Sequence, residues 1–408
     1  MATQFDLDCA LMAGASYIST RADINRFPIP DGWEKITNPD SHFLDQSSGF
    51  EAVSFQNISN PNEIVISFAG TNPRMFDPDW VADFGLTTGF SCAQQLKEAA
   101  AYYLEIKKAN KDNPNITISF TGHSLGGGLA ALLGVFFDKK AVTFDQAPFA
   151  KSAKESIRNE LVTYLNGLYS PEELATLAPE LFFFTNSDLA SREGKVSGFY
   201  VKGEVLSVNL PSWTIGNQKQ LTQGAPADNL AFQISLHSQT LLTAFLQNDA
   251  FLKVTDKLPD MVKMLFDERL FAHDPSKLVD PKRNFLEGLI QHQTGASGDD
   301  MLGRFTADLQ LVAQDGGLTM SNNDITKALI AFAMQKYDNE QTTGAGAGTK
   351  LFSNVGMTGG IHFDRTNVAA TLDGEKDGAI GYKGTDMDKM FTAYLNSLSL
   401  GGTTDVLK

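Results

Sequence analysis

The chain is poor in cysteine and in positive charge. Its 408 residues include two cysteines, Cys9 and Cys92, in no spacing typical of a metal or redox site. Two residues define no disulfide framework, so we expect buried thiols, with a single disulfide as the alternative. There are 33 Lys and Arg against 48 Asp and Glu, a formal net charge of -15. This balance argues against a nucleic-acid partner and against electrostatic attachment to anionic lipid, but not against an uncharged apolar partner.

Long apolar runs and a basic N-terminal region are also absent. No stretch is long enough for a transmembrane segment, and the first residues are acidic, unlike a Sec signal peptide. The sequence therefore predicts a cytoplasmic protein, or one that is exported by a route without an N-terminal signal. No internal repeat is evident, and no pattern specifies an oligomeric state.

What is present is an ordinary globular composition, with 42% hydrophobic and 20% charged residues. Strand and helix patterns alternate between about residues 50 and 190, which predicts an α/β fold with a mostly parallel sheet and helices on both faces. Beyond residue 248 the patterns become helical. We predict a first domain over 1–247 and a mainly helical C-terminal region over 248–408, whose helical patterns cover 252–270, 282–292, 299–314 and 322–337.

The stretch 121–128 stands between two apolar segments. Residues 115–120 read as a buried strand and 129–137 as a buried helix, so Gly122-His123-Ser124-Leu125-Gly126 is a G-x-S-x-G motif in a strand–turn–helix context. The glycines permit a sharp turn that exposes the Ser124 hydroxyl at the positive end of the helix. The alternative is a Gly-rich loop that only packs a helix on a strand. We predict that Ser124 is a nucleophile.

A serine nucleophile needs a base and an orienting acid, in the chain order Ser, acid, His for this turn. Residues 181–188 read as a buried strand with a polar tip, which favours Asp188 as the acid; Asp145, directly after the strand 141–144, is the alternative. Residues 199–206 read as a hairpin or edge strand. The base is predicted to be His237, in a loop before a helix, since general bases are most often His.

The other five histidines are less suited to the role of base. His123 adjoins the serine on a turn that points it away, and His42 precedes the motif. The remaining three lie in the C-terminal region, where a structural role is the default: His273, His292 and His362.

An oxyanion site needs backbone N–H donors from the residue after the nucleophile and from a neighbouring strand end. Leu125 supplies the first. Thr71, at the end of the apolar strand 63–70, is placed to supply the second; a plain turn is the alternative reading of 70–73.

Three segments, 66–71, Asp79–Asp83 and 122–127, together resemble the class 3 lipases, over about residues 5–247. The resemblance implies an α/β-hydrolase fold with the same Ser124, Asp188 and His237 triad and the same oxyanion donors. It also implies that Asp83 supports the oxyanion threonine, and that 72–90 form a lid whose apolar contacts are Phe76 and Trp80, with core burial as the alternative. It implies a lipid or other apolar ester as substrate, met at an interface.

The chain departs from the family in three places. Ala69 replaces a usual basic residue, 145–150 lack the usual glycine-proline-arginine pattern, and 151–180 are longer than expected.

From the motif, the expected triad and the resemblance, we predict a serine ester hydrolase that acts on lipid esters as a triacylglycerol lipase or esterase. The alternatives are a phospholipase A1, an acyltransferase, or a catalytically silent binding protein.

Such a triad needs no cofactor, and we predict no metal in the site. The acidic turn 373–378 lacks the ligand ladder of an EF-hand, so a solvated turn is favoured over calcium binding there.

Overall fold

The fold is that of a computed structural model, which describes residues 2–37, 42–45, 47–70, 91–209, 213–267, 283–291, 300–314, 323–344, 346–354 and 361–363. The chain divides into two compact units. Unit 1 comprises 1–222 and 227–246, and unit 2 comprises 223–226 and 247–408. Each unit is described by itself.

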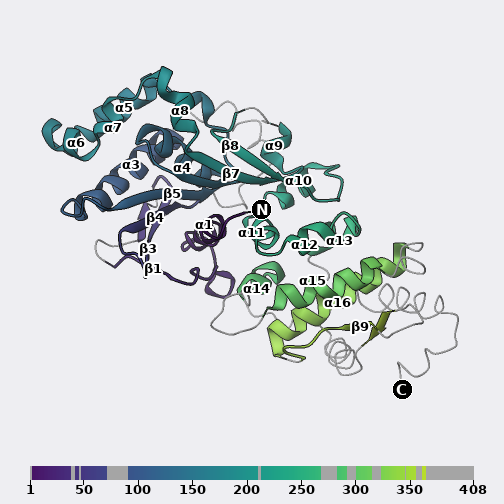
Figure 1. The fold of residues 1–408 in the computed structure, drawn as a ribbon. Coiled ribbons are helices and arrows are strands. Elements are labelled where there is room, and N and C mark those ends of the chain that lie inside the picture. Colours follow the sequence, from purple (N-terminus) through teal and green to yellow (C-terminus); the bar gives the residue numbers. More distant parts are fainter. Residues whose placement is uncertain are drawn as a thin grey trace, which may run out of the picture. The chain divides into compact units, whose positions relative to one another are not determined.

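Unit 1 is built on an eight-stranded sheet in the order β1-β3-β4-β5-β6-β7-β8, with β2 also paired to β3 (Figure 1). The strands β4 to β8 run parallel, and β1, β2 and β4 are antiparallel to β3. The strands are β1 (Trp33–Lys35), β2 (His42–Asp45), β3 (Phe50–Asn57), β4 (Glu63–Phe68), β5 (Thr117–His123), β6 (Ala141–Phe144), β7 (Val196–Val201) and β8 (Asn217–Leu221).

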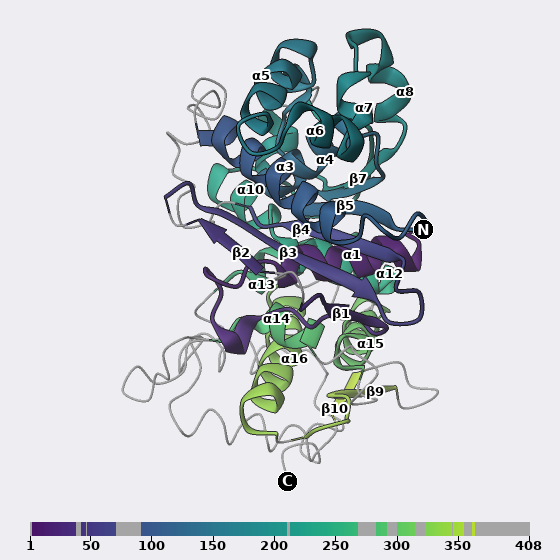
Figure 2. The same cartoon turned by 90° about the vertical axis from the view of Figure 1, so that its left-hand side faces the viewer.

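Helices cover both faces of this sheet. Alternate residues of a strand point to opposite faces: Phe68 joins the core under α4, while its neighbour Ser67 donates to the Met12 carbonyl of α1 at 3.1 Å. Figure 2 shows α3 and α4 on one face and α1 on the other. The helices of unit 1 are α1 (Gln4–Ala15), α3 (Ser91–Ala109), α4 (Leu125–Phe136), α5 (Glu155–Leu165), α6 (Pro171–Leu177), α7 (Pro179–Phe182), α8 (Leu189–Glu193), α9 (Val205–Asn209), α10 (Leu230–Leu236) and α11 (Gln239–Gln247), with short 3-10 helices η1 (Asp23–Asn25), η3 (Ala150–Ser152) and η4 (Asn186–Asp188). The predicted α/β fold class is confirmed.

Residues 181–188, predicted to be a strand, contain none: α7 ends at Phe182 and η4 covers 186–188, with a turn between them. Pro179 is the first residue of α7, a position that proline favours, and Phe183 ends that turn with 74% of its surface exposed. Only Phe184 of the aromatic run is fully buried. The run Leu181–Phe184 thus resembles a core strand in composition, but it forms the end of α7 and the turn that follows.

The stretch predicted as a hairpin or edge strand contains the end of an interior parallel strand. β7 pairs with β6 on one side and with β8 on the other. β8 has the polar sequence NQKQL and no apolar alternation, so its pattern gave no strand signal; it is the sheet's edge.

Unit 2 is mainly helical in its described part. Its helices are α12 (Asp249–Val254), α13 (Pro259–Leu265), α14 (Phe285–Gln291), α15 (Met301–Gln314) and α16 (Asn323–Thr343), and a two-stranded sheet pairs β9 (Phe352–Asn354) with β10 (Ile361–Phe363). The single helix expected over 252–270 is broken before Pro259. Buried aromatic rings meet around Phe305, which lies edge-on to Phe285 at 5.5 Å and to Tyr337 at 5.4 Å between centroids.

A buried carboxylate in the middle of α15 links that helix to α16 and to the start of the small sheet of unit 2. Asp308 accepts the backbone N–H of Leu351 at 2.8 Å and that of Phe352 at 2.9 Å, and the Tyr337 hydroxyl at 2.7 Å. Burial raises the pKa of Asp308 above its usual range. The predicted acidic turn 373–378 lies outside the described residues.

Candidate active site

The parallel strands bring polar residues to one edge of the sheet. Phe68 is in register with Gly122, His123 with Phe144, and Phe144 with Phe199. The carboxyl ends of β4 to β7 therefore stop at a common level, and the residues that follow them converge there. This edge is where ligands bind in open parallel sheets.

Ser124 links β5 to α4 in a strained turn. Its backbone has φ 58° and ψ −124°, in the left-handed region that non-glycine residues seldom adopt. The side chain is 1% exposed. The Ser124 carbonyl accepts from Gly128 and Ala147, and its N–H donates to Phe144, each at 3.0 Å. These bonds fix the predicted nucleophile elbow between β5, β6 and α4.

Two glycines make room for this turn. A Cβ on Gly126 would lie 2.0 Å from the Phe68 carbonyl oxygen, and a Cβ on Gly122 would lie 2.4 Å from the Gly126 carbonyl carbon. Because these are backbone atoms of β4 and α4, neither contact is relieved by a side-chain rotation.

Gly126→Ala should therefore destabilise the fold by about 3 kcal/mol or more, the upper range for overpacking a tight site. That corresponds to a drop of roughly 6–12 °C in the midpoint of thermal unfolding, which calorimetry would measure. Gly194→Ala is the matched control, since Gly194 is exposed, has helical φ and ψ, and a Cβ there would lie 3.3 Å from its nearest neighbour. Equal midpoints for the two variants would contradict the expectation.

His237 contacts the serine as predicted. It ends α10, two residues before α11 begins, and is 5% exposed. Its Nε2 lies 2.8 Å from Ser124 Oγ. The side chain is thus held in position by the link between two helices that pack within unit 1.

The carboxylate that pairs with His237 is Glu204. Its Oε2 lies 2.8 Å from His237 Nδ1, and both side chains are 2% exposed. Glu204 follows β7 after a two-residue turn in which Gly203 has φ 88°. Glu204 also accepts the N–H groups of Leu206, at 2.8 Å, and of Ser207. These bonds satisfy the free N–H donors at the start of α9.

The prediction of Asp188 as the acid is corrected by this geometry. Asp188 lies in η4, and its carboxylate caps that turn by accepting the Thr185 hydroxyl at 2.7 Å and the Thr185 N–H at 3.0 Å. These bonds lower the pKa of Asp188. The residue is half-buried and makes no described bond to His237. It was placed at a strand end only because 181–188 were assigned to a strand.

Asp145, the alternative acid, does stand at a strand end but faces another partner. It directly follows β6, has φ 40°, and is fully buried. Its Oδ1 accepts the N–H of Val201 at 3.0 Å, and its Oδ2 lies 3.7 Å from His123 Nε2. Burial and the neighbouring charge of Glu204 raise the pKa of Asp145 well above its usual range.

His123 lies beside His237, and in the described residues its side chain makes no hydrogen bond to Ser124. Its Nδ1 is 2.9 Å from the Tyr17 hydroxyl, and its ring lies 4.8 Å from that of His237. Burial and the neighbouring His237 lower the pKa of His123 well below its usual range. A neutral imidazole could act as a base, so what separates His123 from that role is its position: its Nδ1 pairs with Tyr17, and the ring nitrogen beside Ser124 Oγ belongs to His237.

Only part of the expected oxyanion site lies in the described residues. Leu125 is the first residue of α4, so its N–H has no acceptor within the helix. Gly70 ends the neighbouring segment close to the turn: a Cβ there would lie 2.6 Å from the His123 carbonyl oxygen. The other expected residues are outside the described part: Thr71, Phe76, Trp80 and Asp83.

None of the remaining histidines and cysteines has a described side chain in this site. Cys9 is a buried free thiol in α1. The side chains of Cys92, His42 and His362 are outside the described part, as are all atoms of His273 and His292.

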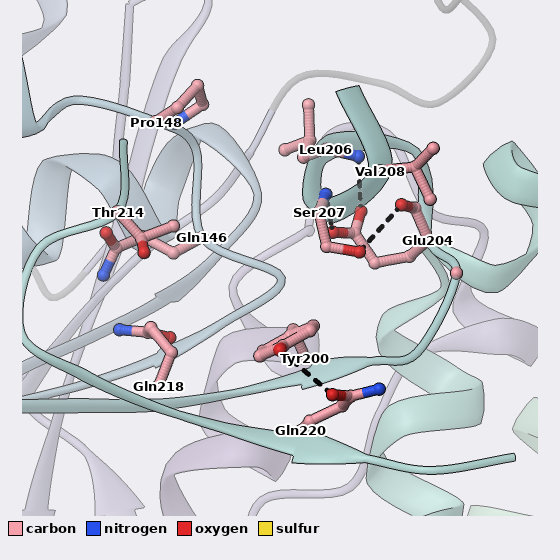
Figure 3. A pocket seen from close by; sticks show the side chains of 11 residues that line it. Gln146, Pro148, Tyr200, Glu204, Leu206, Ser207, Val208, Thr214, Gln218 and Gln220 are labelled. Atoms are coloured by element: carbon pink, nitrogen blue, oxygen red, sulfur yellow. Dashed lines mark hydrogen bonds between the residues drawn. The ribbon is translucent and has the colours of Figure 1, made fainter. Parts of the chain in front are cut away.

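A pocket with a volume of about 440 Å³ lies beside Glu204, lined by residues of β7, β8 and α9 and of the segment after β6 (Figure 3). Its lining combines the Glu204 carboxylate, amide and hydroxyl groups, and the apolar side chains of Pro148, Leu206 and Val208. Tyr200 donates to Gln220 at 3.3 Å across its floor. Its lining includes Gln146, Ser207, Thr214, Gln218 and Gln220.

Comparison with known proteins places the chain in a family. The sequence model of the phospholipase-like family, described as a Tle-like phospholipase domain, matches residues 9–241. The chain belongs to this family. The matched range contains Ser124, Glu204 and His237, and the lipase-like resemblance drawn from the sequence is confirmed at this level.

Individual relatives match parts of this chain. An extracellular phospholipase A1 of Serratia liquefaciens is 36% identical over 103 residues, which are 25% of this chain and 29% of the relative. This chain thus spans under a third of that relative's length.

The structural comparison also matches two solved lipases at low sequence identity. Lipase II of Rhizopus niveus is 15% identical with a TM-score of 0.34, covering 54% of this chain and 82% of its own. A Rhizomucor miehei lipase in complex with its propeptide is 15% identical with a TM-score of 0.35, covering 60% and 80%. In the part of the chain that the structure describes, no helix has both the length and the apolar character needed to cross a bilayer.

Proposed function

We propose that this chain hydrolyses carboxylic esters of phospholipids through an acyl-enzyme on Ser124. The observation that carries the proposal is the continuous chain of hydrogen bonds from Ser124 Oγ to His237 Nε2 and from His237 Nδ1 to Glu204, each 2.8 Å long. This arrangement activates a serine hydroxyl, which is otherwise a weak nucleophile. The phospholipase-like family and the phospholipase A1 relative support a phospholipid ester as the substrate.

The proposed reaction starts with proton transfer. Glu204 accepts the Nδ1–H of His237 and so leaves the Nε2 lone pair directed at the serine. His237 takes the Ser124 proton as Oγ attacks the ester carbonyl, and the Leu125 N–H at the positive end of α4 stabilises the oxyanion. His237 then protonates the leaving lysophospholipid oxygen. His237 then takes a proton from a water molecule as that water attacks the acyl-enzyme carbonyl. His237 returns the proton to Ser124 Oγ as the fatty acid leaves.

The substrate panel that tests this proposal compares three ester classes. Purified protein is expected to release fatty acid from phosphatidylcholine vesicles faster than from long-chain triacylglycerol, and to hydrolyse p-nitrophenyl butyrate. A fluorophosphonate probe is expected to label one site per chain, at Ser124. Turnover of triacylglycerol alone would contradict the phospholipid assignment, and acyl transfer to an added alcohol in preference to water would identify an acyltransferase. No turnover and no labelling would identify a silent binding protein.

A further inference from the structure

Two buried polar atoms face each other beside the triad without a hydrogen-bond partner in the described part of the chain. They are His123 Nε2 and Asp145 Oδ2, on side chains that are 5% and 0% exposed. Their separation of 3.7 Å is too long for a direct hydrogen bond. An unpaired buried polar atom costs free energy, so two that converge on one point indicate a site for a ligand.

His237 is the third side chain of this cluster. One ligating atom from each of His123, Asp145 and His237 lies within 4.8 Å of the others. The three residues come from the end of β5, the end of β6 and the link between α10 and α11. Asp145 is held toward the cluster by a backbone with φ 40°, the kind of strain that concentrates at functional sites.

The second polar atom of each side chain is already held by the protein. His123 Nδ1 pairs with the Tyr17 hydroxyl at 2.9 Å, Asp145 Oδ1 accepts from Val201 at 3.0 Å, and His237 Nδ1 pairs with Glu204 at 2.8 Å. Metal-binding histidines characteristically have their other ring nitrogen fixed in this way. His123 Nε2 and Asp145 Oδ2 are thus left to bind a ligand, and the third ligating atom would be His237 Nε2, which pairs with Ser124 Oγ at 2.8 Å and would have to exchange that bond for the metal.

We propose that these three atoms bind a divalent ion of the zinc class, and that the bound ion inhibits hydrolysis. Two imidazoles and one carboxylate are a ligand set of tetrahedral zinc sites, in which metal–ligand bonds of about 2.1 Å set ligating atoms roughly 3.4 Å apart. The His123–Asp145 separation of 3.7 Å is close to that value. Magnesium prefers oxygen ligands and does not fit the set.

Inhibition follows from competition for one lone pair. His237 Nε2 lies 2.8 Å from Ser124 Oγ, and a nitrogen that is bound to a metal cannot accept the serine proton. The inhibitory part of this inference rests on the proposed function, whereas metal binding itself does not. Ser124→Ala removes the competing hydroxyl, so the variant should bind zinc at least as tightly as the native chain.

Calorimetric titration with zinc chloride tests the binding. We expect one ion per chain at this site, in the native protein and in Ser124→Ala. Asp145→Asn should weaken binding about tenfold or more, the cost typical of disturbing a metal's protein partners. His123→Gln should do the same, and it provides the test if Asp145→Asn fails to fold. Asp188→Asn is the matched control, a half-buried carboxylate that should leave binding unchanged.

Turnover of p-nitrophenyl butyrate tests the inhibition. Zinc should inhibit the native enzyme and EDTA should restore activity, while magnesium chloride has no effect. Zinc affinity that is equal in native, Asp145→Asn and His123→Gln proteins would overturn the site, and zinc binding without inhibition would overturn the role of His237 Nε2. Absence of turnover before zinc is added contradicts the proposed function instead, and calorimetry then still decides the metal site.

Discussion

Ser124→Ala is expected to reduce ester turnover by roughly 10⁶-fold in kcat, the loss typical of removing a serine nucleophile whose base and acid then have nothing to activate. The Ser124 hydroxyl pairs with His237, which in turn pairs with Glu204, so in the proposed mechanism its loss removes the group that attacks the ester. Initial rates with phosphatidylcholine and with p-nitrophenyl butyrate would measure the loss, and fluorophosphonate labelling should disappear in parallel.

The matched control for this substitution is Ser191→Ala. Ser191 is exposed, and its hydroxyl donates to the Asp188 carbonyl within unit 1. This variant should keep the native rate, and circular dichroism should show that both variants are folded. A Ser124→Ala protein that retains turnover would exclude the acyl-enzyme mechanism.

Glu204→Gln is expected to lower kcat by about 10⁴-fold, while Asp188→Asn changes it less than about twofold. A glutamine amide at position 204 donates a hydrogen bond to His237 Nδ1 and so forces the ring proton onto Nε2. In that tautomer His237 has no lone pair to accept the Ser124 proton. Both variants replace a carboxylate by its amide, so a difference in kcat between them reflects where the residue lies and not the kind of substitution.

Steady-state kinetics of these two variants would decide between the two candidate acids. A loss with Asp188→Asn and none with Glu204→Gln would restore the acid predicted from the sequence. Glutamine retains one acceptor oxygen for the start of α9, so the fold near residue 205 should persist. An unchanged thermal midpoint would confirm that the loss of rate is not a loss of structure.

The α/β fold and two of the three proposed triad residues could be predicted from local patterns. The elbow has a sequence signature because its turn excludes side chains at Gly122 and Gly126. His237 could be predicted because few histidines follow the serine in the α/β part of the chain. The first signal depends on glycine having no side chain, and the second on histidine being the most common general base.

Glu204 could not be found in the same way, because its role depends on counting strands correctly. The apolar run at 181–184 imitates a strand, and the polar β8 lacks strand alternation. If β8 is not recognised as a strand, β7 is assigned to the edge of the sheet. A carboxylate that follows β7 is then not expected among the interior strand ends, where the site lies. The one available signal is Gly203, whose φ of 88° turns the chain sharply after β7.

The hydrogen bonds from α9 to Glu204 have a consequence for the entropy cost of each catalytic turnover. The same Oε2 that pairs with His237 also accepts the Leu206 N–H, and Oε1 accepts that of Ser207, so the carboxylate has no freedom to rotate. The entropy of aligning it is lost once, during folding, and not again in each turnover. A glutamate is needed for this arrangement, because an aspartate at position 204 is one methylene shorter. It would lose either the hydrogen bonds from the α9 N–H groups or the one to the His237 imidazole.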